Sequence, residues 1–420
     1  MWYDTGAADP LCMRVMAGSC TLINRRRFIA AAGAALAAST AVGCGTQTAT
    51  PADTPHRVGD PATGDGRHQA GIVTPAQRHL QIAAFNFERE SSLDLRELLK
   101  RWSVLAHALA VSDRTSTGSG EGDEALGLQH TALTITFGLG PSLFRQDGHD
   151  RLGLARNRPD ALAQLPAFRG DALEPAYVNG DLCVQACAND PQAAFHALHA
   201  LTREATGYAT PRWVQSGFLP SAPGTPRNLM GFKDGTNNIA ADDPVALERH
   251  VWVGADDEPA WMRNGTYMIV RRIRMLLDVW DATSIQEQEA TIGRHKISGA
   301  PLGAHSEHDP VDLAASRHDG SPALPPDAHV RLAAAANNRG VRILRRGYNY
   351  ADGIDPATGQ RDAGLIFISF QRNPRQFIGL QRRLAAHDAL AKHIIPTGSA
   401  IFACPPGASS GGFVGQSLFG

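Results

Sequence analysis

The chain has 420 residues, a formal net charge of -1 and 43% hydrophobic residues. This composition is typical of a globular protein, and the length predicts two packed units once terminal segments are set aside. The balanced charge, without a basic stripe of interleaved aromatic residues, disfavours a nucleic-acid partner.

Residues 1–44 are predicted to be a targeting segment. Residues 24–29 read Asn-Arg-Arg-Arg-Phe-Ile, which fits the twin-arginine export pattern, and an alanine-rich run follows up to Gly43. That run is too short and too weakly apolar for a membrane span, so a membrane anchor is the less favoured alternative. We expect cleavage after Ala41, with lipidation of Cys44 as the minority alternative. The protein is therefore expected to be periplasmic, at the cell surface or extracellular.

Residues 45–67 are rich in Thr, Pro, Gly and Asp and predict a flexible linker. The next unit, residues 68–225, has the strand and helix patterns of a β-α-β-β-α-β order. Its expected elements are a strand at 79–87, a helix at 93–108, strands at 133–139 and 182–188, a helix at 192–202 and a strand at 212–218.

The second unit, residues 226–420, repeats this order. Pro191 and Pro374 each follow a strand-like run and precede a helix-like one, and they lie 183 positions apart. The expected elements are strands at 266–276, 341–347, 365–371 and 399–404, with helices at 284–293 and 375–386. We therefore predict an α+β fold of two ferredoxin-like halves.

Three cysteines belong to the folded body. Cys183 and Cys187 lie in one expected strand, where four residues span about 13 Å, which is too far for a disulfide. Together with Cys404 they are predicted to be buried packing thiols. No C-x-x-C-H motif occurs, so covalent haem attachment is not supported.

Residues 231–238 read Gly-Phe-Lys-Asp-Gly-Thr-Asn-Asn and place Asp234 inside a turn. The glycines allow backbone angles that other residues avoid, and the Thr and Asn side chains can hold the turn locally. By itself the motif also fits an aspartate that caps a surface turn. Its catalytic interpretation depends on two motifs further along the chain.

The first of these is His329, on a short helix after Pro325-Pro326-Asp327. Asp327 is expected to be the N-cap, and His329 is expected to share a helix face with Leu332, Ala333 and Ala336. A core or surface histidine is the alternative.

The second motif is the expected strand at 341–347, which carries Arg345 and Arg346. Alternation places Arg345 on the face of Val341 and Ile343, where an arginine needs a partner. Arg346 is expected on a solvated face with Arg342. A structural salt bridge is the alternative role for Arg345.

Taken together, these motifs resemble the dye-decolorizing peroxidase family, and most closely its branch of exported deferrochelatase/peroxidase proteins linked to iron uptake. The resemblance extends over roughly residues 68–406. It implies that the second half holds one non-covalent haem b, with His329 as the axial iron ligand. The hydrogen-bond partner of His329 stays open between Asp388 and a backbone carbonyl.

The resemblance also implies roles for residues on the other side of the haem. Asp234 is the expected acid–base, since one carboxylate can move a proton between the two oxygens of peroxide. Arg345 is expected to stabilise the negative charge that develops, and to contact the haem. The haem edge is expected to be lined by Gly235, Thr236 and Asn237. Because aspartates ordinarily titrate near ~3.9, we expect an acidic pH optimum.

Two local features depart from or compete with this interpretation. Where relatives often have Asn-Pro-Arg after the proximal helix, residues 334–336 are Ala-Ala-Ala, so polar contacts to a haem propionate are lost there. Residues 305–309 read His-Ser-Glu-His-Asp, a spacing that can bind zinc. A polar surface loop is the favoured interpretation of that segment.

We therefore predict a peroxidase that uses hydrogen peroxide to oxidise phenolic, dye-like or porphyrin substrates, with release of iron from haem as a further activity of this branch. Electrons for bulky dyes are expected to pass through a surface Tyr or Trp. An iron-transport complex and a homo-oligomer are the other expected partners. The alternative from another class is an exported haem-binding or iron-handling protein without turnover, which needs His329 but neither Asp234 nor Arg345. Chlorite decomposition is disfavoured by an Asp beside the Arg.

Overall fold

The computed structural model describes residues 66–112, 131–409 and 411–420. The expected targeting segment and residues 45–65 of the expected linker lie outside this part of the chain. No helix among the described residues is long and apolar enough to cross a membrane.

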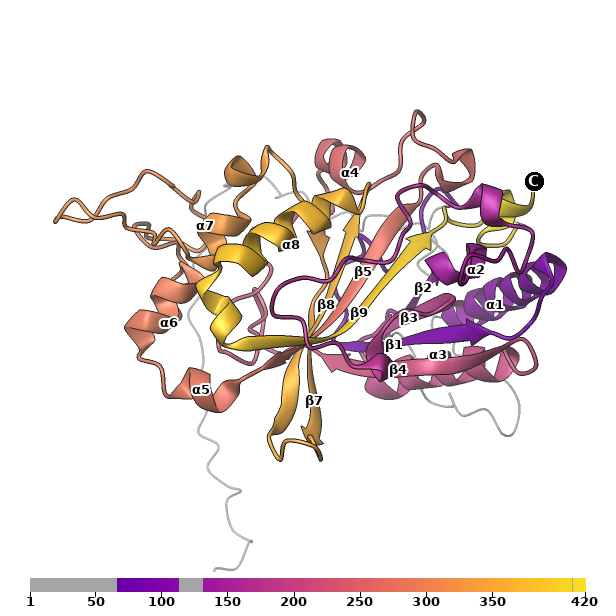
Figure 1. The fold of residues 1–420 in the computed structure, drawn as a ribbon, viewed down its shortest axis with the longest axis horizontal. Coiled ribbons are helices and arrows are strands. Elements are labelled where there is room, and N and C mark those ends of the chain that lie inside the picture. Colours follow the sequence, from indigo (N-terminus) through magenta and orange to yellow (C-terminus); the bar gives the residue numbers. More distant parts are fainter. Residues whose placement is uncertain (1–65, 113–130, 410) are drawn as a thin grey trace, which may run out of the picture. The chain divides into compact units, whose positions relative to one another are not determined.

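Nine strands of the described residues form one sheet, and the named strands pair antiparallel throughout. The order is β5-β9-β2-β3-β1-β4-β7-β8-β6, and β5 also pairs with β8, so the sheet closes into a barrel (Figure 1). The strands are β1 (His79–Phe87), β2 (Thr134–Leu139), β3 (Leu182–Ala188), β4 (Ala209–Phe218), β5 (Thr266–Met275), β6 (Leu344–Arg345), β7 (Tyr348–Ile354), β8 (Arg361–Gln371) and β9 (Ile394–Cys404).

The α-helices are α1 (Ser92–Ser112), α2 (Pro141–Phe144), α3 (Pro191–Glu204), α4 (Pro244–His250), α5 (Leu277–Asp281), α6 (Ile285–Ile292), α7 (His329–Ala333) and α8 (Arg375–His387). Helices and antiparallel strands therefore build an α+β chain, as the sequence predicts. The closure of the strands into one barrel is a feature that the sequence did not predict.

The barrel closes through two narrow seams. Inside each half, neighbouring strands share several residue pairs, whereas β2 and β9 share only Leu139 with Ala403, and β4 and β7 share only Phe218 with Asn349. The closure therefore rests mainly on side chains that pack inside the barrel.

Many of those inner side chains are apolar, and buried polar residues such as Gln185 and Arg272 lie among them. The apolar side chains come from both halves and include Ile82, Met268, Ile368 and Phe402, all of which are fully buried. The three cysteines Cys183, Cys187 and Cys404 are free and lie in the same cluster, as the prediction of packing thiols requires. The outer face of the first half packs against α1 and α3. Helix α8 packs on the second half through Phe377.

Several elements begin and end where local chemistry predicts. Asp190 caps α3 and accepts hydrogen bonds from the backbone of Gln192 and Ala193, with Pro191 in the first turn. Helix α6 starts with a capping box between Ser284 and Glu287. It ends at Gly293, whose positive φ of 90° is accessible to glycine.

The expected strand at 341–347 is wrong in its bounds. The strand begins at Leu344, and β6 holds only Leu344–Arg345. Arg346 N still donates to Ile368 O, and pairing with β8 continues in the same register into β7. Helices α4 and α5 were not predicted either. Both are short, so tertiary packing rather than an extended apolar period determines them.

Gly364 marks the tightest approach between β8 and β5. A Cβ built there would lie 2.0 Å from the carbonyl oxygen of Ile273. We expect Gly364→Ala to lower the free energy of unfolding by about 1–3 kcal/mol or more. Gly379→Ala is the matched control, because nothing lies within 4 Å of a Cβ on this exposed face of α8. The control is expected to raise the free energy of unfolding by about 0.5–1 kcal/mol. Denaturant titration measures both, and equal values would contradict this account of the β5–β8 contact.

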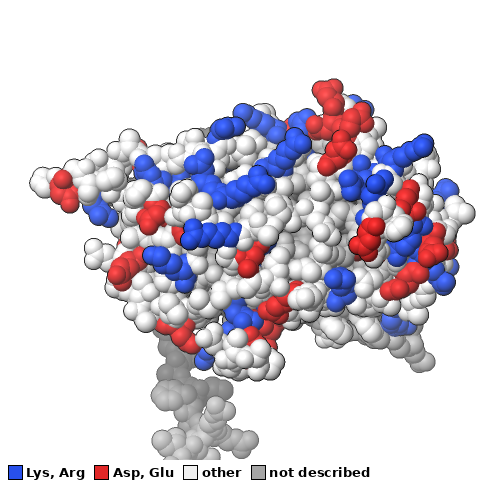
Figure 2. Space-filling model, viewed as in Figure 1, with Lys and Arg blue, Asp and Glu red and all other residues white. Residues whose placement is uncertain are grey.

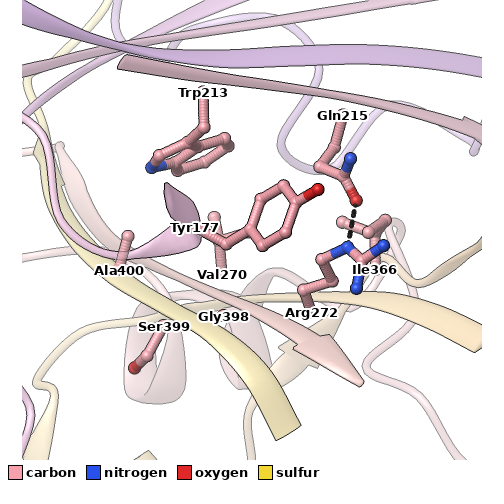
Figure 3. A pocket seen from close by; sticks show the side chains of 9 residues that line it. All are labelled: Tyr177, Trp213, Gln215, Val270, Arg272, Ile366, Gly398, Ser399 and Ala400. Carbon is pink, nitrogen blue, oxygen red and sulfur yellow. Dashed lines mark hydrogen bonds between the residues drawn. The ribbon is translucent and has the colours of Figure 1, made fainter. Parts of the chain in front are cut away.

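Arg272 of β5 is buried at a hollow lined by side chains of β4, β5, β8 and β9 (Figure 3). Its guanidinium lies between the rings of Tyr177 and Tyr350, 4.5 and 4.2 Å from their centroids, and pairs with Asp362 at 2.6 Å. The hollow admits about one water molecule, which is too little for an organic substrate. The charge of Arg272 is therefore matched inside the protein.

Basic side chains gather over α8 (Figure 2). Arg375, Arg382 and Arg383 lie exposed along this helix, which contains no acidic residue. The only aromatic residue of the helix, Phe377, faces the core. This stripe therefore lacks the interleaved aromatic residues on which nucleic-acid bases stack.

Candidate functional site

Asp234 and Arg345 lie together although 111 positions separate them. The Arg345 Nη1 donates to Asp234 Oδ1 at 2.7 Å. The backbone N–H of Asp234 donates to the carbonyl of Pro226 at 2.8 Å, which fixes the turn that carries the carboxylate. The side chains of Asp234 and Arg345 remain 26% and 31% exposed. The ion pair is therefore positioned at a surface that a small molecule can reach.

Asn238 holds the backbone of Arg345. Its Oδ1 accepts from Arg345 N at 2.9 Å, and its Nδ2 donates to Arg345 O at 2.7 Å. The amide thus takes the place of a neighbouring strand on the edge of β6. Asn238 belongs to the turn motif, but the sequence suggested no role for it beyond stabilising that turn.

His329 is the first residue of α7, and its ring is held from the end of α8. Its Nδ1 lies 2.6 Å from Asp388 Oδ2, so Nδ1–H donates to this buried carboxylate. The other oxygen of Asp388 accepts from Leu390 N at 2.9 Å. Of the two partners left open by the sequence, Asp388 is the one found. Nε2 is then the ring nitrogen left for a metal.

Electrostatics link His329 to the Asp234–Arg345 pair. Burial by itself lowers the pKa of His329, but the neighbouring Asp388 outweighs it, so that the pKa lies above its ordinary value. The charges of Arg345 and Asp234 also act on this pKa, with opposite signs. The ion pair therefore lies near enough to His329 for its charges to act on the ring.

The start of α7 differs from the prediction. The N-cap is Ala328 rather than Asp327, and no side chain caps the helix. Ala328 is fully buried, which indicates that packing and not capping sets this boundary. Ala336 lies beyond the end of α7, in the 3-10 turn Ala335–Asn338, so it does not share a helix face with His329.

Arg346 is the opposite of the expected solvated residue. It is 5% exposed, and its guanidinium donates to the Thr74 carbonyl and to Gln77 Oε1. Pairing with β8 keeps one register from Leu344 to Ala351, so Arg346 alternates onto the inner face of the barrel with Leu344 and Tyr348. Alternation thus separated Arg346 from Arg345 as expected, but the face that was expected to be solvated is the buried one.

The three remaining predicted residues follow Asp234. Gly235 has a φ of 113° and no atom within 4 Å of a built Cβ, so it borders open space. Thr236 directs its hydroxyl to Glu307 Oε1 at 3.0 Å. Asn237 is exposed. Their contact with a haem edge stays a prediction.

The His-Ser-Glu-His-Asp segment does not gather metal ligands. No group of three His, Cys, Asp or Glu side chains suited to a metal occurs in the described residues. The carboxylate of Glu307 instead accepts from Lys233, Thr225 and Thr236. The pKa of Glu307 is about 2. Burial by itself raises this pKa, but the hydrogen bonds from these donors, with the Lys233 ammonium first among them, lower it by more than burial raises it.

Both halves of the chain match models of one protein family. Residues 69–219 match the N-terminal part of Dyp-type peroxidases, and residues 225–409 match the C-terminal part. The chain belongs to the Dyp-type peroxidase family. The turn with Asp234, the edge strand with Arg345 and the His329–Asp388 pair all lie within the C-terminal match.

Curated relatives of this Dyp-type peroxidase chain carry two names. A protein named dye-decolorizing peroxidase from Thermobifida fusca is 40% identical over 368 residues, which are 83% of either chain. A protein named deferrochelatase from Escherichia coli K12 is 35% identical over 404 residues, which are 91% of this chain and 94% of the relative.

Among solved structures, ferric DtpA from Streptomyces lividans is 39% identical and superposes with a TM-score of 0.79. The superposition covers 87% of this Dyp-type peroxidase chain and all of that structure. The barrel and the helices around it are therefore shared with a solved structure.

Asn238, Glu307 and Asp388 are the parts of the site for which the sequence gave no definite role. Each contacts a residue at least 59 positions away. No local period or cap signals such contacts. The signals available were the place of Asn238 within the turn motif and the choice of Asp388 as one of two partners left open for His329.

Proposed function

We propose that this chain is a haem b peroxidase of the dye-decolorizing type, which oxidises phenolic or dye-like substrates with hydrogen peroxide. The observation that carries the proposal is the joint placement of the Asp234–Arg345 pair and the His329–Asp388 pair within the family match. One pair suits proton transfer and the other suits ligation of an iron.

The residues present fit a haem. Asp388 occupies Nδ1 of His329, so Nε2 would hold the iron, and 32% of the His329 side chain remains open for that contact. Gly235 would let the group approach the backbone, since it carries no Cβ. We propose one non-covalent haem b per chain, because the described cysteines are buried.

When bound, haem supplies the iron that peroxide oxidises and that the reductant returns to its resting state. The carboxylate of Asp234 takes the proton from the peroxide oxygen that approaches the metal and returns it to the departing oxygen. Arg345 stabilises the negative charge on the departing oxygen and holds Asp234 in place. Asp388 keeps the proton on Nδ1, so that Nε2 keeps its lone pair for ligation.

The test is a visible spectrum of the chain after haem addition, followed by hydrogen peroxide and a phenolic reductant. A Soret band and turnover are expected. An intact fold that takes up no haem would overturn the proposal.

The carboxylate of Asp388 should tune the haem site. We expect Asp388→Ala to weaken haem binding or peroxidase activity by about 10- to 100-fold, because His329 loses the acceptor that orients its ring. Haem titration and steady-state rates measure the effect. Asp319→Ala is the control, since this carboxylate is exposed and bonds only within its own turn. Equal haem affinity in both variants would contradict the role.

Release of iron from haem is a second proposed activity. Relatives named deferrochelatase, 34–35% identical over most of the chain, support it. Product analysis decides between the two activities: free protoporphyrin with loss of iron supports this one, and an intact haem after turnover supports peroxidase activity alone. Porphyrins would then join phenols and dyes as substrates.

The cellular setting is proposed on the sequence. The twin arginines within residues 24–29 support export to the periplasm, the cell surface or the outside of the cell. The deferrochelatase relatives support a link to iron uptake and a transport complex. We also propose a homo-oligomer.

The two ferredoxin-like halves are proposed as the internal architecture of the barrel. The strand orders β2-β3-β1-β4 and β7-β8-β5-β9 support this proposal, because both follow the same arrangement. In both, the first strand of the half lies between its third and fourth strands, when β6 and β7 are counted together as the second strand of the second half.

A further inference from the structure

The connection between α6 and α7 folds back onto the turn that carries Asp234. Its contact residue is Glu307, whose side chain is 14% exposed. The carboxylate accepts from Lys233 Nζ, directly before Asp234, and from Thr236 Oγ1 at 3.0 Å, two residues after it. It also accepts from Thr225 Oγ1. One carboxylate thus accepts hydrogen bonds from the turn on both sides of Asp234.

Glu307 is itself held by its loop. Buried Arg294 donates to the carbonyls of Glu307 and Gly299, at 3.0 and 2.6 Å. Asp309 accepts from the backbone of Ser306 and His305, at 2.7 and 3.0 Å, which shapes the turn around Glu307. The loop around Glu307 is therefore held by hydrogen bonds of its own, and these fix the position of the Glu307 carboxylate.

The side chain of Lys233 passes close to Gly299. A Cβ at Gly299, where φ is 80°, would lie 2.7 Å from Lys233 Cδ. The lysine therefore crosses the loop at a point where only glycine leaves room, and its ammonium reaches Glu307. This contact joins residues 74 positions apart, so it exists only if loop and turn are formed together.

The hydrogen bonds of Glu307 lie beside the Asp234–Arg345 pair. Arg294 lies close enough to Arg345 for that charge, after burial, to lower its pKa. Glu307 remains charged in mildly acidic solution, because its pKa is about 2. The hydrogen bonds that Glu307 accepts from the turn therefore persist in mildly acidic solution.

We propose that Glu307 is a positioning residue for Asp234, which locks the turn 233–236 so that the Asp234 carboxylate stays aimed at Arg345 and at bound peroxide. The inference rests on the proposed peroxidase function for its kinetic consequence. A catalytic group displaced by about 1 Å can lose ~100-fold in rate, so we expect Glu307→Ala to slow the reaction with peroxide by about 10- to 100-fold. Glu307→Gln, which keeps an oxygen for the threonines, should lose less.

A double-mutant cycle separates positioning from a general structural role. Glu307→Ala should slow the peroxide reaction in the wild-type background and have little further effect in the Asp234→Asn background, since the two act as a unit. The KM for the reductant should be unchanged. Glu97→Gln is the control, because it removes an exposed carboxylate paired with Arg101 on α1. Equal losses in both backgrounds, or no loss, would overturn the proposal.

A second readout needs neither haem nor activity. Hydrogen exchange of the haem-free full chain should be faster at residues 231–238 in Glu307→Ala than in the wild type or in Glu97→Gln. Unchanged exchange in that segment would overturn the proposal even if the chain were inactive. The wild-type chain could instead neither bind haem nor turn over, while exchange is still faster in Glu307→Ala. That result would refute the peroxidase function and support the role of Glu307 in holding the turn.

Discussion

Asp234→Asn is expected to lower the rate of the haem-loaded chain with hydrogen peroxide by about 100- to 10,000-fold. Asparagine keeps the size of the side chain and an oxygen for Arg345 but cannot accept the proton of peroxide. The Soret band should be unchanged, because His329 and Asp388 are untouched. Stopped-flow mixing with peroxide measures the rate.

Asp242→Asn is the matched control for this experiment, since Asp242 is exposed and lies eight positions away. The wild-type rate should also persist into mildly acidic solution, as aspartates ordinarily remain ionised there. A full rate in Asp234→Asn would support the rival interpretation, a haem-binding protein without turnover. A rate that peaks above neutrality and falls steeply toward pH 5 would count against Asp234 as the base.

His329→Ala is expected to remove or shift the Soret band and to weaken haem binding by more than the about 10- to 100-fold expected for Asp388→Ala. The variant removes the ring nitrogen that would ligate the iron, and it leaves Asp388 Oδ2 without its donor. Haem titration followed by visible spectroscopy measures both effects.

Imidazole added to His329→Ala should restore part of the band, because it can occupy the space of the lost ring. His387→Ala is the control, since this histidine is exposed at the end of α8. Haem binding with a wild-type spectrum in His329→Ala would show that another residue ligates the iron.

The sequence predicted the elements whose signals are local. The strand at 79–87 and the strand at 182–188 have the predicted bounds, because mostly apolar runs end there at polar turns. The offset of 183 also placed both Pro191 and Pro374 at helix starts, although Pro374 is an N-cap and Pro191 a first-turn residue. Closure of the barrel was not predictable, since two seams of one residue pair each leave no pattern.

At the site, residue types were predicted better than their surroundings. Asp234, Arg345 and His329 were selected by motif; Asp234 and Arg345 form an ion pair, and their charges act on the pKa of His329. The solvation of Arg346 was predicted wrongly because alternation separates the two faces of a strand but does not tell which face lies inside the barrel. Asp388 was one of two partners that the sequence left open for His329, and the structure selects it. The partner Glu307 was out of reach because hydrogen bonds between distant loops depend on the folded chain and not on neighbouring residues.

The narrow seams of the barrel have a consequence for how the chain can be divided. All four side chains of the proposed site, Asp234, Arg345, His329 and Asp388, follow residue 225, yet the inner face of their sheet is covered by the first half. A fragment of the second half alone would expose that apolar face to water and aggregate. Supplied together, the two fragments carry complementary faces, so fragment complementation should restore the site. The first half thus serves the chemistry as an intramolecular folding partner.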